Sequence, residues 1–80
     1  KPRGIPSSEL EKNVLSLDEF EAMRLADLEE MYHEDAARMM GISRQTFGRI
    51  LSSARRKTAD AIVNVKLLAI EGGDVETDVS

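Results

Sequence analysis

The segment "MMGIS", residues 39–43, constrains the fold of this chain more than any other stretch. Gly41 can adopt the positive φ that ends a helix, Ile42 can pack as an apolar plug, and Ser43 is a favourable N-cap for a new helix. A helix end, a tight turn and a helix start therefore fit within five residues. This spacing predicts a helix-turn-helix unit.

The residues after this turn predict one long amphipathic helix. At 100° per residue, its apolar side chains fall within about 60° of a single line. We therefore expect a helix of about 25 residues, from Arg44 to about Leu68. The residues on this line are Phe47, Ile50, Leu51, Ala54, Ala61, Ile62, Val65, Leu68 and Ala69, with Thr58 in the gap.

Two shorter helices are predicted before the turn. Ser16 and Glu19 have the spacing of a capping box, and Leu15 and Phe20 that of a hydrophobic staple. They start a helix from about Leu17 to Glu29, and a second helix covers about His33 to Met40. The residues expected to be buried are Phe20, Met23 or the stem of Arg24, and Leu28 in the first helix, and Ala36, Ala37 and Met40 in the second.

The chain ends differ from this helical part, and the predicted fold class is all-α. Residues 1–15 form an N-terminal arm: two prolines hold "KPRGIP" extended, and Ser8 with Glu11 predicts a short helical turn. Residues 16–70 form the helix-turn-helix domain. Residues 71–80 form a flexible acidic tail, although "LLAIE" could extend as a strand if it found an edge.

The second half of the long helix predicts a homodimer. Its apolar seam outruns what two short helices can cover, and a domain of this size buries a thin core of its own. Residues of the seam are Ala61, Ile62, Val65, Leu68 and Ala69. In the alternative, the N-terminal arm folds back over the seam with Ile5, Val14 and Leu15.

The net charge of −4 hides an uneven distribution. Residues 36–59 carry six basic side chains and no acid, whereas residues 7–35 sum to −8 and residues 60–80 to −4. A charge run is usually a solvated helix face. An acid-free window over a helix-turn-helix instead favours nucleic acid as the partner.

The face of the long helix opposite its apolar line suits the major groove of duplex DNA. Arginine can bond bidentately to guanine and glutamine to adenine, and residues near the start of a recognition helix meet the base edges. We assign base reading to Arg44, Gln45 and Arg49. The other candidate contacts are Ser43 and Thr46 on nearby phosphates, Gly48 and Ser52 on the same surface, and Arg55, Arg56 and Lys57 on the backbone. The alternative is that these are ordinary solvated side chains.

Several classes of function are disfavoured by composition. The chain has no cysteine and one histidine, His33, so we expect no disulfide, no metal site, no cofactor and no enzymatic activity. No apolar run approaches the length of a membrane span, which with the missing cysteines predicts a cytoplasmic protein. The three aromatic residues form no stacking platform, which favours duplex DNA over single strands.

The segment "LSLDEFEAMRLADLEEMYHEDAARMMGISRQTFGRILSSARRK", with "KPRGIP" before it and "IEGG" after it, resembles a family of small, poorly characterised prokaryotic proteins described as candidate DNA-binding proteins. The resemblance covers nearly the whole chain. The helix-turn-helix of this family is similar to region 4 of bacterial sigma factors, which reads promoter DNA. The likeness implies that Ala37, Gly41 and Ile42 hold the turn, that Phe47 and Ile50 pack the recognition helix, and that Arg44, Gln45 and Arg49 point at DNA.

Two functions follow as expectations. The first is a sequence-specific duplex DNA-binding protein, a transcriptional regulator that acts as a dimer. The second is a protein-interaction module that contacts RNA polymerase or another regulator through its sigma-like fold, with the acidic first third facing a basic partner.

Overall fold

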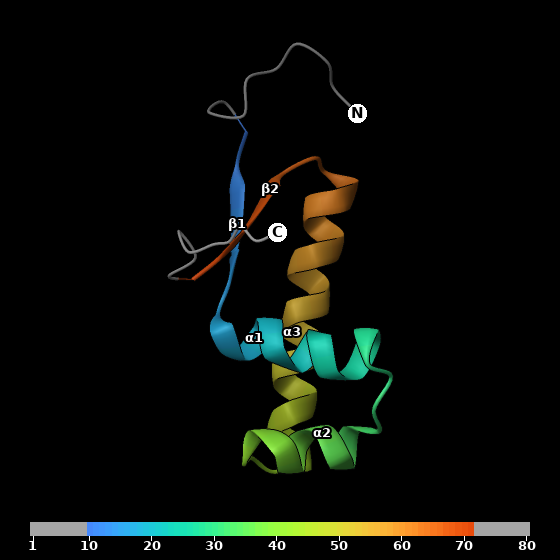
Figure 1. Cartoon of the computed structure of the whole chain (residues 1–80). Coiled ribbons are helices and arrows are strands. Elements are labelled where there is room, and N and C mark those ends of the chain that lie inside the picture. The colour runs from blue at the N-terminus through green and yellow to red at the C-terminus, as the bar shows by residue number, and fades with distance from the viewer. Residues whose placement is uncertain (1–9, 72–80) are drawn as a thin grey trace.

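The computed structural model describes residues 10–71 of the 80-residue chain. Strand β1 (Lys12–Leu15) leads into helix α1 (Leu17–Met23), which continues as the π-helix η2 (Arg24–Leu28). Helix α2 (His33–Met40), helix α3 (Arg44–Val63) and strand β2 (Leu67–Ile70) follow. In Figure 1, α3 forms the axis, α1 crosses it near the middle, α2 crosses its lower end, and the strands lie beside its upper half. The predictions for residues 1–9 and 72–80, including Ile5, Ser8 and the tail, lie outside the described residues.

The first helix begins as predicted. The Ser16 hydroxyl accepts from the Glu19 amide at 3.1 Å, and the Glu19 carboxylate accepts from the Ser16 amide at 2.8 Å. This capping box satisfies two amides that no helical bond can reach. The helix then runs without a break to Leu28, and its last turn is a π-helix in which the Glu29 amide donates to the Arg24 carbonyl at 2.9 Å.

The predicted buried face of this helix is wrong. Ala22 and Leu25 are buried, at 0% and 2% exposure, whereas Phe20 is 39% and Leu28 74% exposed. A π turn has more residues than an α turn, so the side chains within η2 depart from the α-helical period. Leu28, the last residue of η2, therefore does not follow Leu25 onto the buried face. Met23 is half-buried, as expected for a residue at the edge of the contact.

The tight turn between α2 and α3 has the predicted geometry. Gly41 has φ +72°, its amide donates to the Arg38 carbonyl, and the Ile42 amide donates to the Ala37 carbonyl. Ser43 then caps α3 by accepting from the Thr46 amide at 3.0 Å. The left-handed conformation costs glycine little, which explains why the chain can turn here so sharply.

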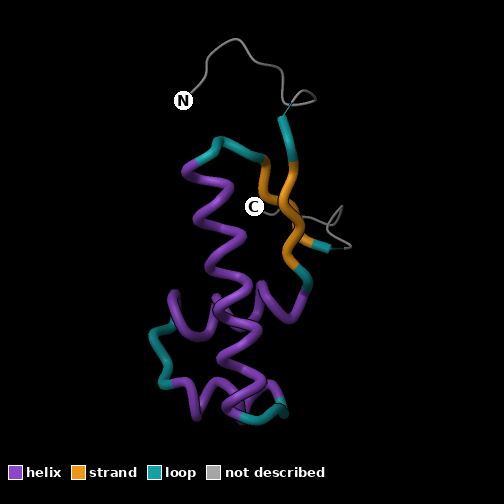
Figure 2. Tube along the Cα trace, turned by 180° about the vertical axis from the view of Figure 1, so that it is seen from behind, coloured by secondary structure: helices purple, strands orange, loops and turns teal. Residues whose placement is uncertain are grey.

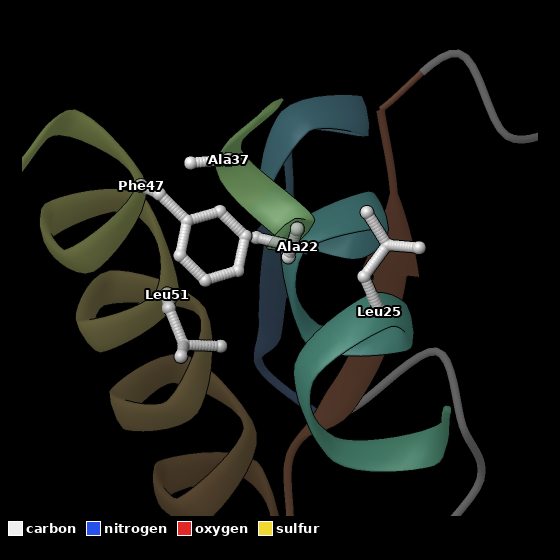
Figure 3. Packing of buried hydrophobic residues seen from close by; sticks show 6 residues of the cluster. Ala22, Leu25, Ala37, Phe47 and Leu51 are labelled. Atoms are coloured by element: carbon white, nitrogen blue, oxygen red, sulfur yellow. The ribbon is translucent and has the colours of Figure 1, made fainter. Parts of the chain in front are cut away.

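The helices share one small core. Phe47 and Leu51 of α3 are buried against Ala22 and Leu25 of the first helix and against Ala37 of α2. Figure 3 shows the Phe47 ring reaching from α3 toward Ala22. The predicted burial of Ala36 and Ala37 is confirmed, and Met40 packs at the core edge. Two adjacent alanines let α2 approach α3 closely.

Helix α3 ends at Val63, so the predicted end near Leu68 is wrong. Val65 adopts φ +53°, and the Lys66 amide donates to the Ala61 carbonyl at 2.8 Å, which closes the helix. The chain then reverses into β2, which pairs in parallel with β1. Leu68 and Ala69 fit a helical period, but they lie in a strand.

The small sheet also corrects the all-α prediction. The structure is mostly helical with one two-stranded parallel sheet, visible from behind in Figure 2 beside the second half of α3. The expectation that "LLAIE" extends if it finds an edge is confirmed, because β1 supplies that edge. Leu15 is 2% exposed, so the alternative in which the N-terminal arm covers α3 holds for this residue. Ile62, expected in the seam, remains 73% exposed.

Candidate nucleic-acid interface

The first half of α3 has one buried and one exposed face. Phe47, Leu51 and Ala54 are buried. Gln45, Arg49, Ser52 and Arg56 on the opposite face are exposed, and so is Arg44 on the flank of the helix. We call these five residues the arginine face. The apolar spacing therefore located this face correctly.

Gly48 leaves open space beside the arginine face. A Cβ atom built at this position would meet nothing within 4 Å. Packing within the chain therefore does not require a glycine here. Because glycine in a helix interior costs about 1 kcal/mol relative to alanine, this position destabilises α3 without a compensating internal contact.

The two hydroxyl residues at the start of α3 bond to each other. The Ser43 hydroxyl accepts from the Thr46 amide and also donates to the Thr46 hydroxyl at 3.0 Å. Ser43 is exposed and Thr46 half-buried. The start of α3 is therefore rigid and presents hydroxyl groups beside Arg44.

Arg55 is held by an acid from the first helix. Its Nε and Nη2 atoms donate to the two carboxylate oxygens of Asp27 at 3.2 and 2.6 Å. This bidentate bond lowers the pKa of the Asp27 carboxyl and raises that of the Arg55 guanidinium. Arg55 was predicted as a DNA backbone contact, and its charge is neutralised within the chain.

Lys57 is held more firmly. Its Nζ donates to the Val14 carbonyl at 2.8 Å and to the Glu19 carboxylate at 2.9 Å. The second carboxylate oxygen of Glu19 accepts from the Ser53 hydroxyl at 2.5 Å. Lys57 therefore ties α3 to β1 and α1, on the side away from the arginine face. Lys57 was predicted, with Arg55 and Arg56, as a DNA backbone contact.

Glu19 is a buried carboxylate that stays ionised. Burial alone would raise its pKa, but hydrogen bonds from Ser53, the Ser16 amide and Lys57 outweigh this effect and lower the pKa to about 2. Its exposure is 8%. The same glutamate thus caps α1 and anchors α3, a role that the capping-box pattern alone did not indicate.

The arginine face keeps three cations without an internal partner. Within residues 10–71, Arg44, Arg49 and Arg56 form no ion pair, whereas Arg38 bonds Asp35 at 3.0 Å. The acid-free window of six basic residues therefore contributes three unpaired charges. These three share one surface of one helix.

An open hollow of about 460 Å³ lies next to this face. Its lining comes from the start of α2 and the start of α3: Met31, Tyr32, His33, Glu34 and Arg44. The Tyr32 side chain is 81% exposed, and the His33 ring packs on Phe47 with centroids 5.3 Å apart. Its exposure beside Arg44 makes Tyr32 a surface residue of the same region.

Among residues 10–71, no three histidine or acidic side chains are arranged to hold a metal ion. None of the helices in this range has the length and apolar character needed to cross a bilayer.

A family model described as "Protein of unknown function DUF134" matches residues 1–78. The chain belongs to this family. Curated relatives are named UPF0251 proteins: one from Prosthecochloris aestuarii is 61% identical over 94% of this chain, and UPF0251 protein CT0950 from Chlorobaculum tepidum is 61% identical over 92%. One from Methanococcus vannielii is 55% identical over 91% of this chain.

The chain spans 48% of the length of the first two relatives and 56% of the third, so it corresponds to about half of such proteins. No solved structure matches the chain. The family assignment therefore rests on the sequence comparisons alone.

Proposed function

We propose that this chain is a sequence-specific duplex DNA-binding module of a transcriptional regulator, in which α2 and α3 act as a helix-turn-helix similar to region 4 of sigma factors. The observation that carries the proposal is the arginine face: three unpaired arginines and a glutamine on the exposed side of a helix that starts directly after a tight turn. Such a surface matches the donor and acceptor pattern of the major groove.

Arg44, Gln45 and Arg49 are the proposed base-reading residues. They lie in the first two turns of α3, where a recognition helix meets base edges. Arg56 lies two turns further along the same face and suits a phosphate. The open space at Gly48 allows close approach of the duplex. Ser43 and Thr46, at the start of the helix, complete the phosphate contacts.

The module acts as a homodimer in this proposal. Three unpaired arginines supply few phosphate contacts, and a single helix-turn-helix reads only a short site. Two copies related by a two-fold axis place two recognition helices about 34 Å apart, one turn of B-DNA. The expected target is therefore a palindrome.

Selection of duplex DNA from a random pool, followed by anisotropy titration of the enriched site, tests the proposal. We expect Arg49→Ala to lose about 1 to 3 kcal/mol of binding free energy and to relax preference at one position. Arg49→Lys keeps the positive charge but loses the planar guanidinium that can bond bidentately to guanine. It should therefore keep nonspecific affinity for DNA and lose selectivity for the base. Lys12→Ala, which removes an exposed cation on β1, is the matched control and should bind as the wild type does.

One observation favours the alternative, a protein-interaction module. An apolar hollow of about 370 Å³ on the first helix is lined by Phe20, Met23, Arg24, Asp27 and Leu28. Because its acid is bonded to Arg55, the hollow suits an apolar segment of a protein partner such as a polymerase subunit. If no site enriches and Arg49→Ala binds DNA as well as the wild type does, the DNA proposal fails and this surface becomes the leading candidate.

A further inference from the structure

Strand β2 has one paired and one unpaired edge. The Leu67 and Glu71 amides donate to the carbonyls of Glu11 and Leu15 at 2.8 and 2.6 Å. Backbone groups of successive residues in a strand point to opposite edges, so Leu68 and Ile70 direct theirs away from β1. Within residues 10–71, β1 is the only strand that pairs with β2. The outer edge of β2 therefore offers the amides and carbonyls of Leu68 and Ile70.

The two outer edges of the sheet are not equivalent. On β1, Lys12 is charged and exposed, and the Val14 carbonyl accepts from Lys57 Nζ at 2.8 Å. On β2, "LLAI" contains neither charge nor proline. Proteins usually protect strand edges with charged side chains, prolines or backbone groups that are already bonded, and an edge without this protection can pair with another strand. A parallel sheet of two strands is also far smaller than those that are stable alone.

We propose that β2 pairs antiparallel with β2 of a second copy of this chain, about a two-fold axis at Ala69. Antiparallel strands alternate between residue pairs that exchange two hydrogen bonds and closer pairs that exchange none. With the two-fold axis at Ala69, Leu68 of each copy lies opposite Ile70 of the other copy. These are the two residues whose backbone groups are unpaired, and the small Ala69 occupies the close pair.

Hydrogen-bond geometry selects the second copy and the antiparallel orientation. A two-fold axis brings the same edge of both strands together, so the outward amides and carbonyls of Leu68 and Ile70 in one copy meet those of the other. Lys66, which precedes β2, is bonded within its own chain to Asp60 at 2.9 Å, so it adds no unpaired charge to this edge. The strand itself is neutral, so two acidic chains can meet there without placing like charges in direct contact. The result is a four-stranded sheet in the order β1-β2-β2-β1.

Exposed apolar residues near this edge favour burial by the second copy. Val65 and Leu68 are 38% and 42% exposed, and Ile62 at the end of α3 is 73% exposed. This inference rests on the proposed dimer and names its interface. The arginine face lies toward the other end of α3. Its tests contain no DNA, so their failure and the failure of DNA binding are distinguishable.

A cysteine cross-link tests the register. The chain has no cysteine, so Ala69→Cys introduces a single thiol. In the proposed pair the two Cα atoms are about 4.5 Å apart, within the range that a disulfide spans. Mild oxidation should convert Ala69→Cys to a covalent dimer at least about tenfold faster than Ser52→Cys, an exposed control on the arginine face. Equal rates for the two variants would overturn the proposed register.

Sedimentation equilibrium at micromolar concentration tests the interface without a new thiol. We expect the wild-type chain to dimerise and Leu68→Lys to weaken the dimer at least about tenfold, because it places a charge at the centre of each half of the pair. Leu28→Lys is the matched control, since Leu28 is 74% exposed on η2, and it should dimerise as the wild type does. Circular dichroism checks that both variants are folded. A monomeric wild-type chain, or equal dimerisation by the two variants, would contradict the proposal.

Discussion

The two halves of α3 use their charged residues in opposite ways. In the first half, Arg44 and Arg49 extend from an exposed face and form no ion pair within residues 10–71. In the second half, Arg55 is bonded to Asp27 and Lys57 to Glu19, and Arg56 alone remains unpaired. A count of basic residues therefore overstates the positive charge available to a partner, because acids of the first helix neutralise the cations that face them.

The largest effect on stability is expected at Glu19, which anchors the second half of α3 through Lys57. Glu19→Gln removes a carboxylate that bonds Lys57 and Ser53, and at pH 7 it should lower the free energy of unfolding by about 3 kcal/mol. Chemical denaturation measures this loss. If Glu19→Gln costs no more than a surface substitution, the contrast between an anchored and an unanchored half is wrong.

The pH dependence gives this prediction a sign. The folded-state pKa of Glu19 is lowered to about 2 from an ordinary value of 4.5. Its stabilisation is therefore complete above about pH 4.5 and is lost as the pH falls toward 2. We expect the wild type to lose stability over that range and Glu19→Gln to lose less, because the pKa values of Glu21, Asp27 and Asp60 are also lowered and these groups remain in the variant. Glu34→Gln, at an exposed carboxylate in the first turn of α2, should follow the wild type.

A smaller effect on the free energy of unfolding, this time an increase, is expected at the turn that follows α3. Val65 has φ +53°, a conformation that a β-branched side chain adopts only with strain. Val65→Gly should raise the free energy of unfolding by about 1 kcal/mol, less the value of the lost side-chain contacts. Val63→Gly, at the last residue of α3, should lower it instead. Equal effects of the two substitutions in thermal denaturation would show that the left-handed conformation of Val65 carries no strain.

Gly48 tests the first half in the same way. Gly48→Ala should raise the free energy of unfolding by about 0.5 to 1 kcal/mol, because the helix gains propensity and the new methyl group meets nothing. Gly48→Leu should fold equally well and bind DNA more weakly, since it fills the approach to the arginine face. Thermal denaturation and anisotropy on the same samples measure both. A Gly48→Leu variant with unchanged affinity would remove this position from the interface.

The smallest effect on stability should come from Asp27→Asn. Its ion pair with Arg55 is half-exposed, so the loss should stay below about 1 kcal/mol. Releasing Arg55 adds one available cation per copy. The slope of log affinity for DNA against log salt should steepen by about 0.9 per copy. An unchanged slope would mean that Arg55 does not reach phosphate even when it is released.

The sequence allowed much of the first half to be predicted. Gly41, Ser43 and the apolar period from Phe47 to Ala54 are local signals, and the turn, the cap and the exposed face followed from them. The second half could not be predicted in the same way. Leu68 and Ala69 continue the helical period, but β1, distant in the sequence, supplies a strand partner that a local pattern does not contain.

The ion pairs of the site were missed for a related reason. Asp27 and Arg55 are 28 residues apart, and Glu19 and Lys57 are 38 apart. The charge pattern showed an acidic segment before a basic one but not which side chains meet. The burial of Leu28 was mispredicted because nothing in the sequence marks the π turn that contains it.

The most direct test of the central claim is to map amide chemical shifts of the isotope-labelled chain during titration with a selected duplex. We predict that the perturbed amides cluster in residues 43–56, with the largest shifts between Arg44 and Arg49. Amides around Leu15 and Ala61, on the anchored half, should move little. Shifts centred on the first helix or on the strands, with residues 43–56 unchanged, would contradict the account that the first half of α3 is the DNA-binding surface.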